Sequence, residues 1–133
     1  MPDLLQLVDI HPALTTLARL IHTAGLTSTL RGPVPLTLFA PADDAFANLA
    51  PSTLATLQQD NAQIETLLLA HLVAGALVAA DLMSLPALAT LDGQQRTVAS
   101  TLGLSIDGAY LTEADILAEN GVLHCIDRVL QVI

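Results

Sequence analysis

Apolar residues in the first half of the chain recur every three or four positions, which is the spacing of a helix with one buried face. The clearest example is residues 11–26 (HPALTTLARLIHTAGL), where Pro12 suits the first helical position and Gly25 suits a left-handed end. Another helix is predicted over residues 61–70 (NAQIETLLLA), with Asp60 placed to cap its first turn. The pattern therefore predicts a mainly helical first half.

The second half changes to short apolar segments separated by turns. The most clearly marked turns are Asp92-Gly93, Asp107-Gly108 and Asn120-Gly121, which are dipeptides typical of hairpins. One earlier strand is predicted at residues 36–40 (LTLFA). Helices followed by strands are typical of an α+β domain with a mostly antiparallel sheet, and not of alternating βαβ units.

The composition is that of a single globular domain, predicted to cover residues 1–133. Hydrophobic residues make up 53% of the chain and charged residues 13%, which excludes a disordered chain. With four arginines, no lysine and thirteen acidic residues, the net charge is −9, so a nucleic-acid partner is not expected. The apolar run over residues 66–80 is shorter than the roughly 20 residues that a membrane-spanning helix needs, so membrane insertion is not expected either.

The N-terminal residues leave two locations open. The first segment, MPDLLQLVDIHP, has an acidic residue where a secretory signal peptide carries basic ones, so the chain is either cytoplasmic or a secreted form without its leader. Cys125 is the single cysteine, which excludes a disulfide within the chain and leaves the role of this thiol undefined. A monomer is expected.

Three segments lie in this order over about one domain length: TLFAPADDAF at residues 37–46, LLLAHLVAG at 67–75 and NGVLHCIDRVL at 120–130. Together they resemble signatures of the fasciclin-like (FAS1) domain family. Ala70 stands where the family has the tyrosine of a Tyr-His pair, so the integrin-type recognition attributed to that pair is not carried over. The positions that match the family motifs, to which the resemblance assigns structural roles, are Thr37, Phe39, Pro41, Asp43, Phe46, His71, Asn120, Gly121, His124 and Asp127.

The resemblance also implies a fold and a function. The fold is a wedge-shaped β-sandwich of about seven mostly antiparallel strands, with helices packed along one side. The function is that of a non-enzymatic module for cell adhesion, which binds a protein or glycan partner and needs no cofactor or metal. The resemblance favours a single-domain bacterial member in the periplasm, in the extracellular space or on the cell surface.

The adjacent acids Asp43 and Asp44 are either a catalytic carboxylate pair or the start of a helix. Neighbouring residues at a helix start point in different directions, and an acid there accepts hydrogen bonds from free backbone amides. Asp43 is therefore expected to cap the helix that follows it, with Asp44 in solvent. Phe46 is expected to return and pack near Phe39.

The two histidines His71 and His124 support a different alternative. With Asp115, Asp127 or Cys125 they could form a mixed-ligand zinc site, or line the pocket of a small ligand-binding or hydrolytic domain. The sequence contains no H-x₃-H or C-x₂-C spacing, and a single histidine on an apolar face is seldom a ligand. The favoured interpretation is that both histidines are buried and hydrogen-bonded to the backbone.

The last strand is predicted to run through residues 123–130 with both faces covered, because apolar residues fall on each face. The candidates for partner-binding contacts are three side chains, Asp44, Tyr110 and Arg128. Two alternatives stay open: Tyr110 could instead pack on its strand, and Arg128 could instead satisfy nearby backbone groups.

Overall fold

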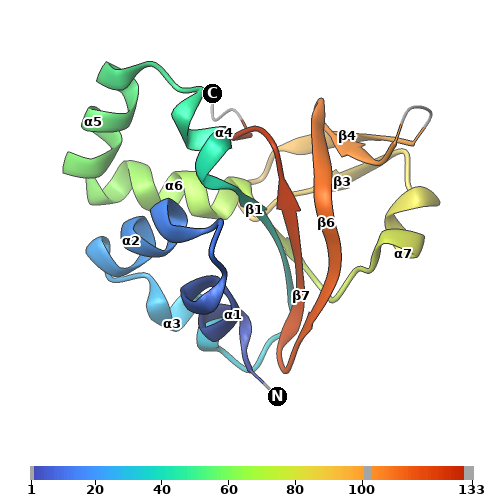
Figure 1. Ribbon diagram of the computed structural model, residues 1–133. Helices are drawn as coiled ribbons and strands as arrows, with labels where there is room; N and C mark the ends of the chain where they lie inside the picture. The colour runs from blue at the N-terminus through green and yellow to red at the C-terminus, as the bar shows by residue number, and fades with distance from the viewer. Residues whose placement is uncertain (1, 101–102, 131–133) are drawn as a thin grey trace.

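The computed structural model describes residues 2–100 and 103–130, in which short helices come first and most of the strands come later (Figure 1). The elements, in chain order, are α1 (Leu4–Ile10), α2 (Thr15–Thr23), α3 (Thr27–Arg31), β1 (Leu36–Pro41), α4 (Asp43–Ala47), α5 (Pro51–Gln59), α6 (Asn61–Ala70), β2 (Leu72–Ala74), α7 (Ala79–Met83), β3 (Ala87–Ala89), β4 (Gln95–Ala99), β5 (Ser105–Ile106), β6 (Ala109–Ala118) and β7 (Gly121–Ile126).

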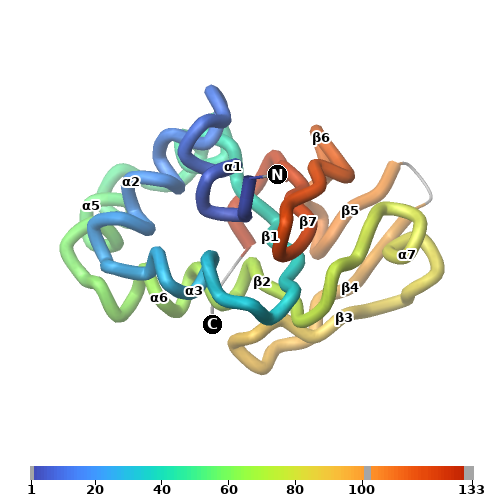
Figure 2. Tube along the Cα trace, turned by 90° about the horizontal axis from the view of Figure 1, so that it is seen from below, coloured from blue at the N-terminus to red at the C-terminus, as the bar shows by residue number. Residues whose placement is uncertain are grey.

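The strands hydrogen-bond in the order β2-β1-β7-β6-β5-β4-β3. The β1–β7 pair is parallel and the other pairs are antiparallel. Helices α1, α2, α3, α5 and α6 lie on one side of β1 and β7, and the rest of the sheet lies on the other side (Figure 2). The predicted α+β fold, with seven mostly antiparallel strands and helices along one side, is confirmed.

The sheet bends over itself and encloses an apolar core. Phe39 of β1, Val73 of β2 and Ile126 of β7 form one cluster with Leu88 of β3 and Val98 of β4. Strands from opposite ends of the sheet order therefore face each other across this cluster, as the two layers of a sandwich do.

A second core lies between the sheet and the helices. It contains Leu38 and Ala40 of β1 and Leu123 of β7, packed against helix residues such as Leu20 and Phe46. All six residues of β1 and all six of β7 are buried, so both faces of these strands are covered, as expected for the last strand.

The expected contact between the two phenylalanines is wrong. Phe39 belongs to the core inside the folded sheet, whereas Phe46 belongs to the core under the helices. Successive side chains of a strand point to opposite faces, so Leu38 and Ala40 of β1 face the helices and Phe39 faces away from them. The two aromatic residues therefore fill different cores.

The first helix differs from the prediction. A separate helix, α1, forms before Pro12, and Asp3 and Gln6 make a capping box at its N-terminus. The predicted helix corresponds to α2, which begins only at Thr15. Gly25 has φ 70°, which is the left-handed conformation expected after the helix. The cap at Asp60 is confirmed, because its carboxylate accepts from the first turn of α6.

Two of the three predicted turns are confirmed: Asp92-Gly93 connects β3 to β4, and Asp107-Gly108 connects β5 to β6. The third turn lies one residue earlier than predicted, because Ala118 pairs with Gly121 and the residues between β6 and β7 are Glu119 and Asn120. No helix in the described part of the chain is long and apolar enough to span a membrane.

The last strand is shorter than predicted, because β7 ends at Ile126. The next residue, Asp127, pairs with Tyr110 through both its backbone amide and its carboxylate. The chain then leaves the sheet, with Arg128 exposed and Leu130 buried again. The remainder of the predicted C-terminal segment, residues 131–133, lies outside the described residues.

Candidate functional site

Asp43 does not cap its own helix, so that expectation is wrong. Helix α4 starts after Ala42 without a side-chain cap. The carboxylate of Asp43 reaches α2 instead, where Oδ1 accepts from the Thr16 amide at 2.8 Å and Oδ2 accepts from the Thr15 hydroxyl at 2.7 Å. Desolvation opposes ionisation, but the hydrogen bonds from Thr16 and Thr15 outweigh it and lower the pKa of Asp43. Asp43, which follows the end of β1, thus holds the first turn of α2 next to that end of the strand.

Replacing Asp43 by alanine is expected to lower the free energy of unfolding by about 1 kcal/mol, because the first turn of α2 loses its carboxylate acceptor. Asp44→Ala is the matched control: it removes the exposed neighbouring acid and should change stability by less than about 0.5 kcal/mol. Urea denaturation followed by circular dichroism measures both. Equal losses in the two variants would contradict the assigned cap.

Asn120 ties the β6–β7 turn to the helical layer. Its side-chain oxygen accepts from the Leu4 amide at 2.9 Å, and its Nδ2 donates to the carbonyls of Leu30 at 2.7 Å and Gly32 at 3.2 Å. One side chain therefore fixes the start of α1 and the end of α3. At the same end of β1, the buried Thr37 hydroxyl donates to the Gly75 carbonyl at 2.7 Å and accepts from the Leu77 amide at 2.8 Å.

His71 is buried, and both of its ring nitrogens bond to the backbone. Nδ1 lies 2.7 Å from the Leu67 carbonyl, and Nε2 accepts from the Leu130 amide at 2.9 Å. These partners place the proton of the neutral ring on Nδ1. Burial lowers the pKa of His71 to about 4, so the ring is neutral at physiological pH.

His124 is buried too, with the opposite tautomer. Nδ1 accepts from the Asp115 amide at 3.1 Å, so Nε2 carries the proton and donates to the Leu77 carbonyl at 2.8 Å. The ring stacks on Phe39 with centroids 5.6 Å apart. Burial also lowers the pKa of His124. Through these bonds, His124 on β7 fixes the backbone of β6 at Asp115 and the segment before α7 at Leu77.

The structure does not bring His71, His124 and Asp127 together in an open pocket. All four ring nitrogens are bonded to the backbone, and the Asp127 carboxylate accepts from the Tyr110 amide at 2.8 Å. A cavity of about 550 Å³ lies elsewhere; it is lined by Leu49, Thr53, Leu57, Gln63, Thr66, Leu67, Val129 and Leu130. The alternative of a ligand-binding or hydrolytic site built on these two histidines is therefore not supported.

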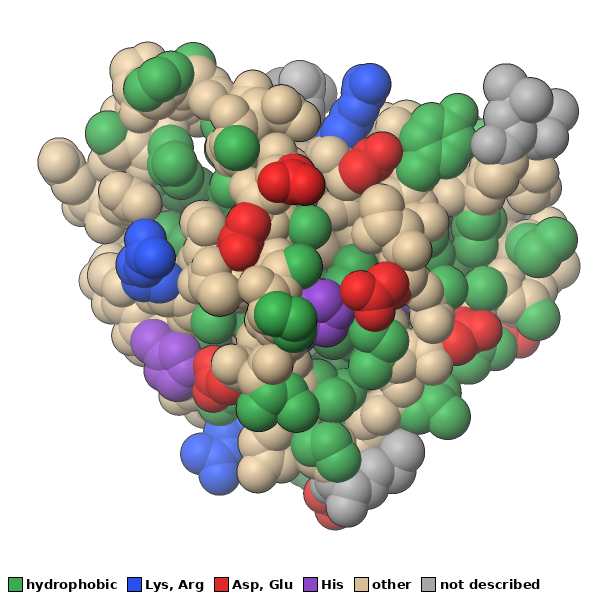
Figure 3. Space-filling model, viewed as in Figure 1, with side chains coloured by type: hydrophobic (Ala, Val, Ile, Leu, Met, Phe, Trp, Pro, Cys, Tyr) green, Lys and Arg blue, Asp and Glu red, His purple; other side chains and the backbone are tan. Residues whose placement is uncertain are grey.

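The three residues expected at a binding surface lie around the end of β7. Asp44 and Arg128 are exposed, and Tyr110 has 40% of its surface exposed. The Ala42 amide donates to Ile126, and Asp127 pairs with Tyr110, so the start of α4 and the start of β6 meet here. In Figure 3 a basic side chain projects from the top of the molecule beside an acidic one, while other acidic side chains lie across the middle of this face.

Arg96 is a buried charged residue that the sequence pattern did not single out. Only 4% of its side chain is exposed, and its guanidinium lies 3.5 Å from Asp92 and 3.2 Å from Asp107. Each of these aspartates belongs to one of the predicted hairpin turns. The two carboxylates thus neutralise a charge that a buried strand position could not otherwise hold.

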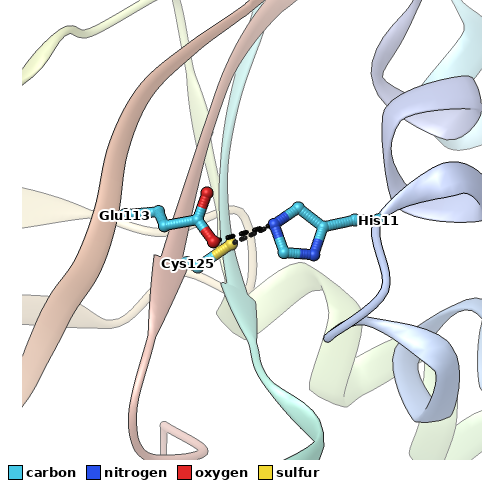
Figure 4. A group of neighbouring side chains, drawn as sticks. All are labelled: His11, Glu113 and Cys125. Carbon is cyan, nitrogen blue, oxygen red and sulfur yellow. Dashed lines mark hydrogen bonds and ion pairs between the residues drawn. The ribbon is translucent and has the colours of Figure 1, made fainter.

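A second polar cluster joins three residues that are far apart in the sequence: His11, Glu113 and Cys125 (Figure 4). His11 follows α1, Glu113 lies on β6, and Cys125 lies opposite Glu113 on β7. Nε2 of His11 is 3.0 Å from Oε1 of Glu113 and 3.7 Å from Sγ of Cys125. The thiol is buried, the imidazole is 14% exposed and the carboxylate is 54% exposed.

This cluster is not an activated nucleophile. The Ala13 amide donates to Nδ1 of His11 at 3.0 Å, so the neutral ring carries its proton on Nε2 and donates it to Glu113. A protonated Nε2 does not accept the proton of the thiol. Burial, together with the nearby Glu113 charge, raises the pKa of Cys125 to about 11, so the sulfur is a thiol at neutral pH.

Sequence reasoning weighed Cys125 as a metal ligand but paired it with other residues. His124 and Cys125 are consecutive on a strand and face opposite sides, so they cannot share an ion. The partners of Cys125 come from a loop 114 positions earlier and from a strand with register shifts on both sides of Glu113. No local spacing in the sequence reports this arrangement.

The folded sheet with its helical layer defines a small α+β module, and comparisons with known proteins identify its kind. The fasciclin domain family matches residues 12–132. The uncharacterized protein sll1735 of Synechocystis sp. is 35% identical over 130 residues, which make up 98% of each chain. The chain belongs to the fasciclin domain family.

Two further relatives carry the same domain within longer chains. Transforming growth factor-beta-induced protein ig-h3 of Sus scrofa is 32% identical over 127 residues, which cover 94% of this chain and 19% of that protein. The solved FAS1 domain pair from the insect cell adhesion molecule Fasciclin I matches with a TM-score of 0.71 and 20% identity, covering 89% of this chain and 45% of that one. That structure shows the shared fold.

Proposed function

We propose that this domain is a non-enzymatic interaction module that binds a protein or glycan partner in the periplasm, in the extracellular space or on a cell surface. Membership of the fasciclin family carries the proposal, since the same fold occurs in an insect cell adhesion molecule. The buried histidines support it as well, because their ring nitrogens are used to hold the fold together.

The surface around the end of β7 is the proposed contact region. Tyrosine and arginine are enriched where proteins bind each other, and Tyr110 and Arg128 are both accessible here. Asp44 adds an opposite charge on the neighbouring helix start. The net charge of −9 favours a partner with basic groups, so binding should weaken as the salt concentration rises.

A surface-binding assay tests the proposal. The purified domain is applied to intact cells and to immobilised matrix proteins and glycans. Each surface that captures the domain is then titrated with it, which measures the affinity. The combined substitutions Asp44→Ala, Tyr110→Ala and Arg128→Ala are expected to weaken capture at least about tenfold, because contact residues of these types dominate interface energies.

Glu119→Ala is the control, since it removes an exposed acid from the turn that precedes β7, at the opposite end of that strand. It should leave the titration unchanged. Capture by the triple variant that equals capture by the unmodified domain would overturn the proposed surface. Failure of the unmodified domain to bind any of these probes would count against the adhesion function itself.

A further inference from the structure

The geometry points to a binding site for a thiophilic divalent cation, such as Zn²⁺ or Co²⁺, formed by Nε2 of His11, Oε1 of Glu113 and Sγ of Cys125 (Figure 4). Imidazole, carboxylate and thiolate are the three ligand types that zinc takes in proteins. These three atoms lie within 4.8 Å of one another, although their residues come from three separate elements.

The separations of Nε2 from its two neighbours are near those of tetrahedral coordination. Metal–ligand bonds of about 2.1 Å for nitrogen and oxygen and about 2.3 Å for sulfur place nitrogen about 3.4 Å from oxygen and about 3.6 Å from sulfur. The observed separations from Nε2 are 3.0 Å to Oε1 of Glu113 and 3.7 Å to Sγ of Cys125. Both separations from Nε2 therefore lie within a few tenths of an ångström of the tetrahedral values, and the oxygen and the sulfur lie within 4.8 Å of each other.

The surrounding backbone holds the ligands in position. Glu113 and Cys125 are register partners across the antiparallel β6–β7 pair, and such opposite residues have adjacent side chains. His11 ends α1, with its amide bonded to the Leu7 carbonyl, and the Ala13 amide holds the imidazole ring. The buried thiol and the exposed carboxylate leave the solvent side for a fourth ligand, which water or a partner group would supply.

Binding changes the proton content in a defined way. The thiol of Cys125 loses its proton to solvent as the sulfur–metal bond forms. The proton on Nε2 of His11 moves to Nδ1, so the neutral ring binds the ion through Nε2 and the hydrogen bond from Ala13 is given up. With the His11 ring neutral, each divalent ion therefore releases one proton, that of the thiol, and affinity is lower than for a site whose histidine already carries its proton on Nδ1.

A cobalt titration of the whole domain, in a thiol-free reductant, tests the site. Because Cys125 is the single cysteine, a thiolate-to-Co²⁺ charge-transfer band reports this residue alone. We expect the band to saturate at one ion per chain, to disappear when Zn²⁺ is added, and to be accompanied by release of one proton per ion, read with an indicator dye. Bound Zn²⁺ should also raise the Tm.

Variants separate the cluster from binding by cysteine alone. His11→Gln and Glu113→Gln are expected to raise the Kd for Co²⁺ at least tenfold, and Cys125→Ser should abolish the band. The control is His22→Gln, which alters the exposed His22–Asp9 pair, 2.8 Å apart and without a thiol, and should change nothing. The partly exposed His11 and Glu113 variants keep the test valid if the buried Cys125 variant does not fold.

Two results would overturn the site. One is the absence of a thiolate band in the unmodified domain up to millimolar Co²⁺. The other is a band whose Kd is the same in the unmodified domain, His11→Gln and Glu113→Gln, because the ion would then be bound by the thiol without the other two residues.

Discussion

Gly121→Ala is expected to lower the free energy of unfolding by at least about 3 kcal/mol, the upper part of the range for an added methyl group with no room. A β-carbon at this position would lie 1.9 Å from the Leu36 carbonyl oxygen and 2.9 Å from its carbonyl carbon. Gly121 and Leu36 are register partners in the parallel β1–β7 pair. The clash is with backbone, so no side-chain rotation relieves it, and the paired strands β1 and β7 would have to separate.

Urea denaturation measures this loss, and Gly32→Ala is its matched control. Gly32 has φ −66°, and a β-carbon there would meet the Ser28 carbonyl at 3.7 Å, an ordinary contact. That substitution should change stability by less than about 0.5 kcal/mol. A Gly121→Ala variant as stable as the Gly32→Ala variant would show that β1 and β7 do not approach as closely as described.

The domain is expected to lose stability in mild acid through His71. The folded state holds this ring neutral with a pKa of about 4, against 6.5 for the free side chain, so between these values the unfolded chain binds the extra proton. Stability is therefore complete above about pH 6.5 and falls as the pH drops to about 4. The shift corresponds to about 3 kcal/mol. The pKa of His124 is lowered in the same direction, so it adds to the loss.

Urea denaturation at a series of pH values between 7.5 and 4 measures this loss. In His71→Gln the dependence of stability on pH should become shallower by the contribution of one proton. If that variant does not fold, the ring resonances of His71 in the unmodified domain give the answer directly. A ring that titrates near pH 6.5, or a stability that stays constant down to pH 4.5, would contradict the assignment.

Features set by neighbouring residues could be predicted from the sequence. The two Asp-Gly turns and the cap at Asp60 depend on one or two adjacent residues, and the structure has each of them, while the turn predicted at Asn120-Gly121 lies one residue earlier. The capping box of α1 is equally local, since Asp3 and Gln6 are three residues apart, but Pro12 favours a later helix start in the sequence pattern. Local chemistry is visible in the sequence wherever its partners are local.

Features that depend on distant partners could not be predicted. Asp43 has the pattern of a cap for its own helix, yet its acceptor oxygens serve Thr15 and Thr16 on another helix. The cluster of His11, Glu113 and Cys125 is still harder to predict from the sequence, because it exists only where register shifts in β6 set Glu113 opposite Cys125. Hydrophobic periodicity reports which face of a strand is buried, but it does not report where a bulge moves the register.

The parallel pairing of β1 with β7 has a consequence for synthesis of the protein. These two paired strands carry the first and the last of the three family motifs, and they lie far apart in the chain, at Leu36–Pro41 and Gly121–Ile126. A polypeptide that emerges N-terminus first therefore presents β1 long before β7, the longer of its two neighbours in the sheet, exists. Until β7 arrives, only the three residues of β2 pair with β1, and the other edge of β1 stays open. The growing chain is thus expected to need protection from aggregation until nearly the whole domain has been made.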